Sequence, residues 1–76
     1  MRFDRITQDQ KRMNGQPCIR DLRITVRRVL EIVAVYPDRQ IIRQEFPELE
    51  DEDLVQALAY AATLLDDSYV DLQSVG

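Results

Sequence analysis

Residues 25–37, TVRRVLEIVAVYP, carry the clearest structural pattern in the chain. Apolar residues recur at the i, i+3, i+4, i+7 and i+8 positions of a helix, at Val26, Val29, Leu30, Val33 and Ala34. This spacing predicts an amphipathic helix with one buried stripe and with its arginines in water. Thr25 is the expected N-cap, and Pro37 ends the helix near Tyr36.

Two further apolar residues of this helix, Ile32 and Val35, fall outside the stripe. A helix with two apolar sides in so small a chain either packs against a second chain or is well buried in its own fold. The sequence leaves both interpretations open.

Two more helices are predicted after Pro37. Asp38 can cap a short helix over residues 39–46, which Pro47 stops. The inward residues of this helix are expected to be Ile41, Ile42 and Phe46. The acidic run Glu50–Asp53 then opens a third helix that continues to about Leu65, because carboxylates favour the positive end of the helix dipole. Its apolar face is expected to hold Leu54, Ala57, Leu58, Ala61, Leu64 and Leu65.

The residues before the first helix indicate a short β element. Alternation over residues 3–7 and two brief extended stretches, 17–20 and 23–26, predict strands around a turn at Asp21 and Leu22, where Asp21 tolerates left-handed backbone. Residues 8–14 are mostly polar and lead into Gly15, which suits a loop with a positive φ. The predicted fold is therefore mainly α, with a three-helix, helix-turn-helix core and a short N-terminal β element.

At 76 residues the chain can hold one small domain. We assign residues 1–67 to this helical domain and residues 68–76 to a C-terminal tail. A core of this size rarely supplies more than roughly 3–5 kcal/mol, so a homodimer is expected. No apolar run is long enough for a membrane span, and no signal-peptide pattern follows Met1, so the cytoplasm is the expected location.

The net charge of −4 hides an uneven distribution. Residues 1–43 hold all ten basic residues and five acids, a net of +5, whereas residues 44–76 hold nine acids and no base, a net of −9. Such asymmetry indicates two surfaces with different roles or two halves that neutralise each other.

The densest basic group comprises Arg20, Arg23, Arg27 and Arg28. Guanidinium groups bind phosphates well, but they can equally pair with acids of the same protein or of a dimer mate, and both readings stay open. The acids that open the third helix would repel DNA, so that helix is not expected to be a recognition helix. If DNA is bound, the contacts are expected from this group together with Arg39 and Arg43.

Catalysis and metal binding have no support in the sequence, and neither a cofactor nor an enzymatic activity is predicted. Cys18 is the single cysteine and there is no histidine, which excludes an internal disulfide and makes a zinc site improbable. Ser68 and Ser74 lack a base. The acidic run at residues 50–53 is interpreted as helix-start electrostatics, because consecutive helical residues point in different directions.

Three pieces of the chain resemble the DUF433 family of small prokaryotic proteins. They are residues 15–26 (GQPCIRDLRITV), 46–49 (FPEL) and 54–61 (LVQALAYA), and the resemblance runs from about Ile6 to Leu65. Asp21 and Leu22 depart from it, since they stand where the family usually has Gly-Thr. This departure affects the local turn and any contact of the threonine hydroxyl.

The resemblance implies a homeodomain-like three-helix core, usually dimeric, and the role of antitoxin in a type II toxin–antitoxin pair whose toxin is a PIN-like ribonuclease. It also implies that Arg23, at the family's arginine, is a structural or contact residue. The acidic second half and the tail would then meet the toxin, through Asp66, Asp67, Tyr69, Val70, Asp71 and Leu72. The alternative is an interaction module that never touches DNA.

Overall fold

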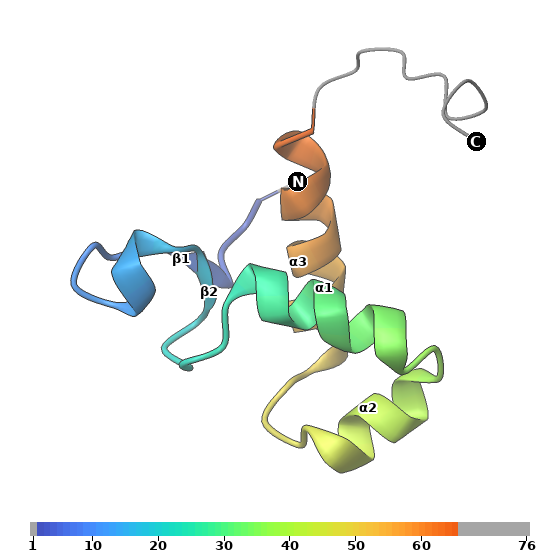
Figure 1. Cartoon of the computed structure of the whole chain (residues 1–76). Helices are drawn as coiled ribbons and strands as arrows, with labels where there is room; N and C mark the ends of the chain where they lie inside the picture. Colours follow the sequence, from blue (N-terminus) through green and yellow to red (C-terminus); the bar gives the residue numbers. More distant parts are fainter. Residues whose placement is uncertain (1, 66–76) are drawn as a thin grey trace, which may run out of the picture.

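The computed structural model describes residues 2–65. Its elements in chain order are β1 (Ile6–Thr7), a 3-10 turn (Met13–Gly15), β2 (Cys18–Ile19), α1 (Val26–Val35), α2 (Arg39–Glu45) and α3 (Asp51–Thr63). The predicted fold, mainly helical with a short N-terminal β element, is confirmed (Figure 1). No helix in this part of the chain is long and apolar enough to cross a membrane.

The β element is a two-stranded antiparallel sheet that pairs Ile6 with Ile19 and Thr7 with Cys18. The loop between its strands reaches away from the helices (Figure 1) and passes through Gly15 at a φ of 79°, as predicted. The turn after β2 was predicted less well. Its left-handed residue is Arg20, with a φ of 49°, and not Asp21.

Helix α1 begins and ends as predicted. The Thr25 hydroxyl accepts a hydrogen bond from the Arg28 N–H at 3.0 Å, and Tyr36 caps the other end. The buried face of α1, however, is turned around the helix axis relative to the predicted stripe. Ile32 is buried and belongs to the protein's own core, whereas Ala34 and Val35 are exposed. The reason is that α1 packs across α3, and this contact selects the Val26, Val29 and Ile32 side of the helix.

Helix α2 is two turns long, and the Asp38 carboxylate caps it by accepting from the Gln40 N–H at 2.9 Å. Only Ile42 is fully buried on it. Phe46 is half-buried in an edge-to-face contact with Tyr36, whereas Ile41 is 41% exposed, which corrects the prediction that it faces inward. Adjacent helical positions point about 100° apart, so a helix this short places one of the two isoleucines in the core.

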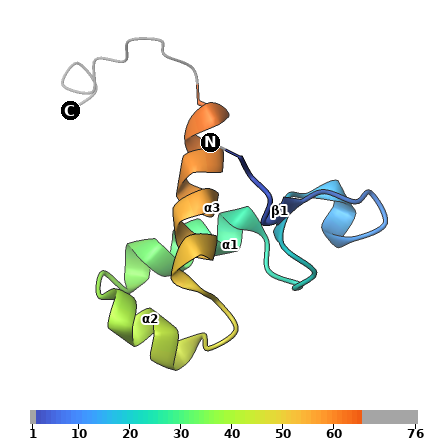
Figure 2. The same cartoon turned by 180° about the vertical axis from the view of Figure 1, so that it is seen from behind.

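Helix α3 is longer than the surface it packs on. Its first half crosses α1, and its second half extends beyond α1 (Figures 1 and 2). Leu54 and Ala57 are buried as predicted, but Leu58, Leu64 and Leu65 are 38%, 65% and 74% exposed. Ala61 is half-buried against the core, so the predicted apolar face is confirmed for Leu54, Ala57 and Ala61 and wrong for the three exposed leucines.

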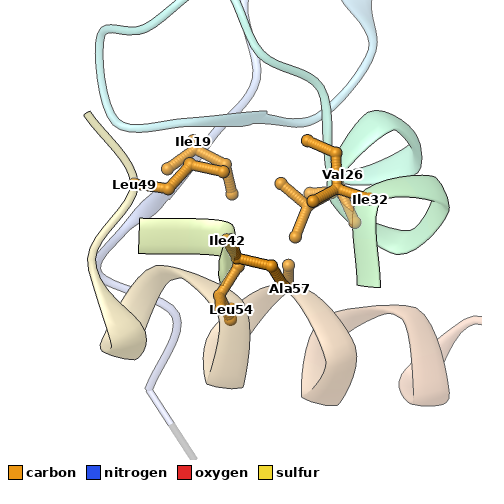
Figure 3. Close-up of a cluster of buried hydrophobic side chains, with 8 residues drawn as sticks. Ile19, Val26, Ile32, Ile42, Leu49, Leu54 and Ala57 are labelled. Atoms are coloured by element: carbon orange, nitrogen blue, oxygen red, sulfur yellow. The ribbon is translucent and has the colours of Figure 1, made fainter. Parts of the chain in front are cut away.

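The core collects side chains from β2, all three helices and the connection before α3. Figure 3 shows it as a cluster of buried hydrophobic residues: Ile19, Val26, Val29, Ile32, Ile42, Leu49, Leu54 and Ala57. Because Ile19 is completely buried, the β element is part of this core.

Candidate functional site

The most buried charged group in residues 2–65 is the carboxylate of Asp53, whose side chain is fully shielded from solvent. Arg20 holds it with two hydrogen bonds, from Nε to Oδ1 at 3.1 Å and from Nη2 to Oδ2 at 2.8 Å. Arg5 Nη1 donates to Oδ1 at 3.0 Å and also to the Glu50 carboxylate. We call Arg5, Arg20, Glu50 and Asp53 the Asp53 ion cluster.

Local backbone structure positions each member of this cluster. Asp53 lies in the first turn of α3, where its Oδ2 accepts from the Glu50 N–H at 2.9 Å and completes a capping box. Arg20 follows β2 directly, and its left-handed backbone accompanies a side chain that also donates to the Glu48 carbonyl at 2.8 Å. The cluster therefore ties the β element to the start of α3.

A second polar tie joins the same two elements. Gln56 is 4% exposed, and its Oε1 accepts from the Arg5 N–H at 3.0 Å while its Nε2 donates to Asp4 Oδ1 at 2.7 Å. The hydrogen bond from Gln56 lowers the pKa of the Asp4 carboxyl. Two neighbouring turns of α3 thus hold residues 4 and 5 in place.

Burial alone would raise the pKa of Asp53, but the hydrogen bonds from Arg20, the Glu50 N–H and Arg5 outweigh burial. They hold its pKa below the ordinary value of 3.8. The stabilisation from this carboxylate is therefore complete above the unfolded-state pKa and is lost as the pH falls through the lower folded-state pKa.

We predict that acid destabilises the native chain more steeply than an Asp53→Asn variant. Urea midpoints measured from neutral pH down to the acid limit should fall for both chains, with the steeper fall in the native chain below about pH 5, and the two curves should converge at the acid end. If the two curves of urea midpoint against pH run parallel, protonation of Asp53 does not contribute to the loss of stability in acid.

The structure separates the six arginines that the sequence grouped as candidate DNA contacts. Arg20 belongs to the Asp53 ion cluster, so its guanidinium is engaged within the chain, as the internal-pairing interpretation expected. Arg43 forms an exposed ion pair with Asp51 at 3.2 Å, and Arg28 lies over the Phe46 ring at 6.0 Å. The other three are exposed and have no ion pair within residues 2–65: Arg23, Arg27 and Arg39.

Two other groups of residues were singled out from the sequence, the candidate partner contacts and the acidic run at the start of α3. The candidate partner contacts from Asp66 to Leu72 lie outside the described residues. The acidic run serves helix initiation, since Glu50 is the N-cap of α3 and Asp53 closes the capping box. Sequence reasoning missed that Asp53 is also the buried centre of an ion cluster. The capping-box spacing of Glu50 and Asp53 was the signal available for their pairing at the helix start.

Together, the fold and this cluster define a small helical domain whose N-terminal β element is fastened to its last helix. The chain belongs to the DUF433 family, described as a protein of unknown function, and the family model matches residues 6–61. No curated protein matches the chain. No solved structure matches it either.

Proposed function

We propose that this protein is a non-enzymatic antitoxin that binds and neutralises a PIN-like ribonuclease toxin in the cytoplasm. The observation that carries this proposal is the exposure of large apolar side chains on so small a domain: Val35 is 69% exposed and Leu64 is 65% exposed. Side chains of this kind gain free energy when a protein partner removes them from water. The family resemblance supplies the class of the toxin.

The thiol chemistry of the chain agrees with a binding role. Cys18, the single cysteine, is 2% exposed and donates to the Gln16 carbonyl, so its sulfur is not presented to a substrate. Leu64 stands near the end of the described residues, two positions before Asp66, the first of the residues that the sequence assigns to the toxin contact. We propose that the contact continues from Leu64 into Asp66, Asp67, Tyr69, Val70, Asp71 and Leu72.

The test is co-purification with the product of the neighbouring reading frame, combined with a ribonuclease assay of that product. We expect the full chain to bind it and to suppress its activity, and a chain ending at Leu65 to lose most of both. A Lys11→Ala variant, changed in the exposed loop between β1 and β2, is the matched control and should behave as the full chain. Undiminished binding by the shortened chain would remove the tail contact from the proposal.

Operator DNA is a second proposed partner, bound by the protein as a dimer. Its support is the continuous stretch from Arg23 to Arg28, in which three exposed arginines have no ion pair within residues 2–65. Arg39 and the paired Arg43 on α2 are proposed to add contacts. Arg20 is left out of this set because Asp53 holds it.

Alanine at Arg23, Arg27 and Arg28 together should weaken operator binding and reduce its salt slope by roughly one unit for each phosphate contact that is lost. Gel shifts at several salt concentrations measure both quantities, and Lys11→Ala again serves as the control. If the native chain binds no operator at physiological salt, the protein is instead a protein–protein interaction module that does not touch DNA.

A further inference from the structure

Among the arginines proposed to bind DNA, Arg28 has an aromatic ring beneath its side chain. It lies in the first turn of α1, where its N–H donates to the Thr25 hydroxyl at 3.0 Å. Its guanidinium carbon stands 6.0 Å from the centre of the Phe46 ring, which is the range of a cation–π contact. None of its side-chain N–H groups donates to a protein acceptor within residues 2–65. Stacking occupies the flat face of a guanidinium and leaves these donors, which lie in its plane, open to a ligand.

The Phe46 ring is itself fixed by the ends of two helices. Phe46 follows α2 directly, and its N–H donates to the Ile42 carbonyl at 2.7 Å. Its ring meets the Tyr36 ring with 5.7 Å between centres and 73° between planes, and the Tyr36 N–H closes α1 by donating to the Ile32 carbonyl. Because α1 and α2 run in opposite directions, the end of α2 returns toward the start of α1, where Arg28 lies (Figures 1 and 2). The ring is therefore a fixed support under a long side chain.

We propose that Phe46 is a positioning residue for DNA binding, which holds the Arg28 guanidinium with its N–H donors toward a phosphate of the DNA backbone. This inference rests on the proposed operator contact and adds to it a residue that acts through Arg28. An arginine loses side-chain freedom when it binds a phosphate, and a side chain that is already stacked loses less of it. A guanidinium also binds a phosphate with two hydrogen bonds at once, which requires a defined orientation. The adjacent Arg27 points about 100° away on the helix, so the ring does not support it.

A double-mutant cycle tests this role with a short fluorescein-labelled DNA duplex of arbitrary sequence, because phosphate contacts do not read the sequence. Fluorescence anisotropy at low salt measures the dissociation constant. We expect Phe46→Leu to raise it about two- to fivefold, which is the worth of an exposed cation–π contact. Arg28→Ala should raise it about tenfold or more, because a charged hydrogen-bonding group is lost. Phe46→Leu should have no further effect in the Arg28→Ala chain, whereas in the Arg27→Ala chain it should keep its full effect.

Three further variants separate positioning from a change in the fold. Phe46→Tyr keeps the ring face and should bind as the native chain does. Phe46→Met, a second apolar side chain without a ring, should repeat the result of Phe46→Leu. Phe3→Leu is the matched control: it alters the edge-to-face pair of Phe3 and Tyr60, 5.4 Å apart, on a helix without arginine, and should leave the affinity unchanged. Far-UV circular dichroism gives the folded fraction by which each dissociation constant is corrected.

The outcomes distinguish the positioning role from the proposed operator binding. A cycle in which Arg28→Ala cancels the effect of Phe46→Leu, and Arg27→Ala does not, supports the positioning role. Unchanged affinity in Phe46→Leu, or an effect that persists at full size in the Arg28→Ala chain, would overturn that role and leave DNA binding standing. A native chain that binds no duplex even at low salt would overturn both.

Discussion

Replacing Asp53 with alanine is expected to unfold most of the protein at room temperature. The substitution leaves the guanidinium groups of Arg5 and Arg20 without their shared acceptor and takes the cap from the Glu50 N–H. Breaking a buried ion pair by removing one partner costs about 3–5 kcal/mol, and a core of this size supplies roughly the same total. Urea unfolding followed by far-UV circular dichroism measures the loss.

Two matched variants test whether the loss of stability comes from the buried ion pair of Asp53 or from the removal of any carboxylate at the start of α3. Asp51→Ala removes a neighbouring carboxylate whose pair with Arg43 is half exposed, so it should cost less than about 1 kcal/mol. Asp53→Asn keeps one acceptor oxygen, but it loses the charge and turns the second oxygen into an N–H donor, so its cost should fall between the two. Equal and small losses for Asp51→Ala and Asp53→Ala would contradict the structural role of the Asp53 ion cluster.

The second large effect is expected from Ile42→Ala. Ile42 is 1% exposed and is the only fully buried side chain of α2, so its removal leaves a cavity between this helix and the rest of the core. Such truncations cost about 2–5 kcal/mol, which again approaches the whole stability of the chain. The measurement is the free energy of unfolding in urea, extrapolated to water.

Ile41→Ala is the natural control because it is the same substitution at the adjacent position. Ile41 is 41% exposed, and surface changes usually stay within about 0.5 kcal/mol. The sequence pattern predicted both isoleucines to face inward, whereas the structure buries only Ile42. The two variants therefore distinguish the structure from the sequence-based prediction. Similar losses in the two variants would favour the sequence-based assignment.

The two isoleucines illustrate how far sequence reasoning reaches in this chain. Capping residues and prolines predicted the helix bounds within a few residues, because Thr25, Asp38 and Pro37 start or end a helix through local hydrogen bonding and backbone geometry. The buried faces were harder to predict. Periodicity shows that residues share a side of a helix, but the extent of burial depends on the helix that covers that side. Leu58 is 38% exposed although the adjacent Ala57 is buried, because neighbouring side chains point about 100° apart on a helix and only one of the two faces α1.

The site was predictable only in part for a related reason. Mutual neutralisation of the basic and acidic halves was one of two interpretations of the charge distribution, and Arg20 does pair with Asp53. The choice of this arginine over Arg23 or Arg27 depends on the left-handed turn after β2 and on the path of the chain between Arg20 and Asp53, which are 33 positions apart. Neither local propensity nor composition carries that information, so both interpretations of the basic group stayed open until the fold was known.

The tie between the β element and α3 also sets an order of events during folding. Arg5 bonds to Glu50, Asp53 and Gln56, partners that follow it by 45 to 51 residues. Closing so long a loop costs entropy before any contact forms, whereas α1 and α2 are joined through a short connection. Residues 4 and 5 are therefore expected to be fixed against α3 only after the helices have formed. Until Asp53 has left the exit tunnel of the ribosome, the guanidinium groups of Arg5 and Arg20 lack the carboxylate that they share in the folded protein.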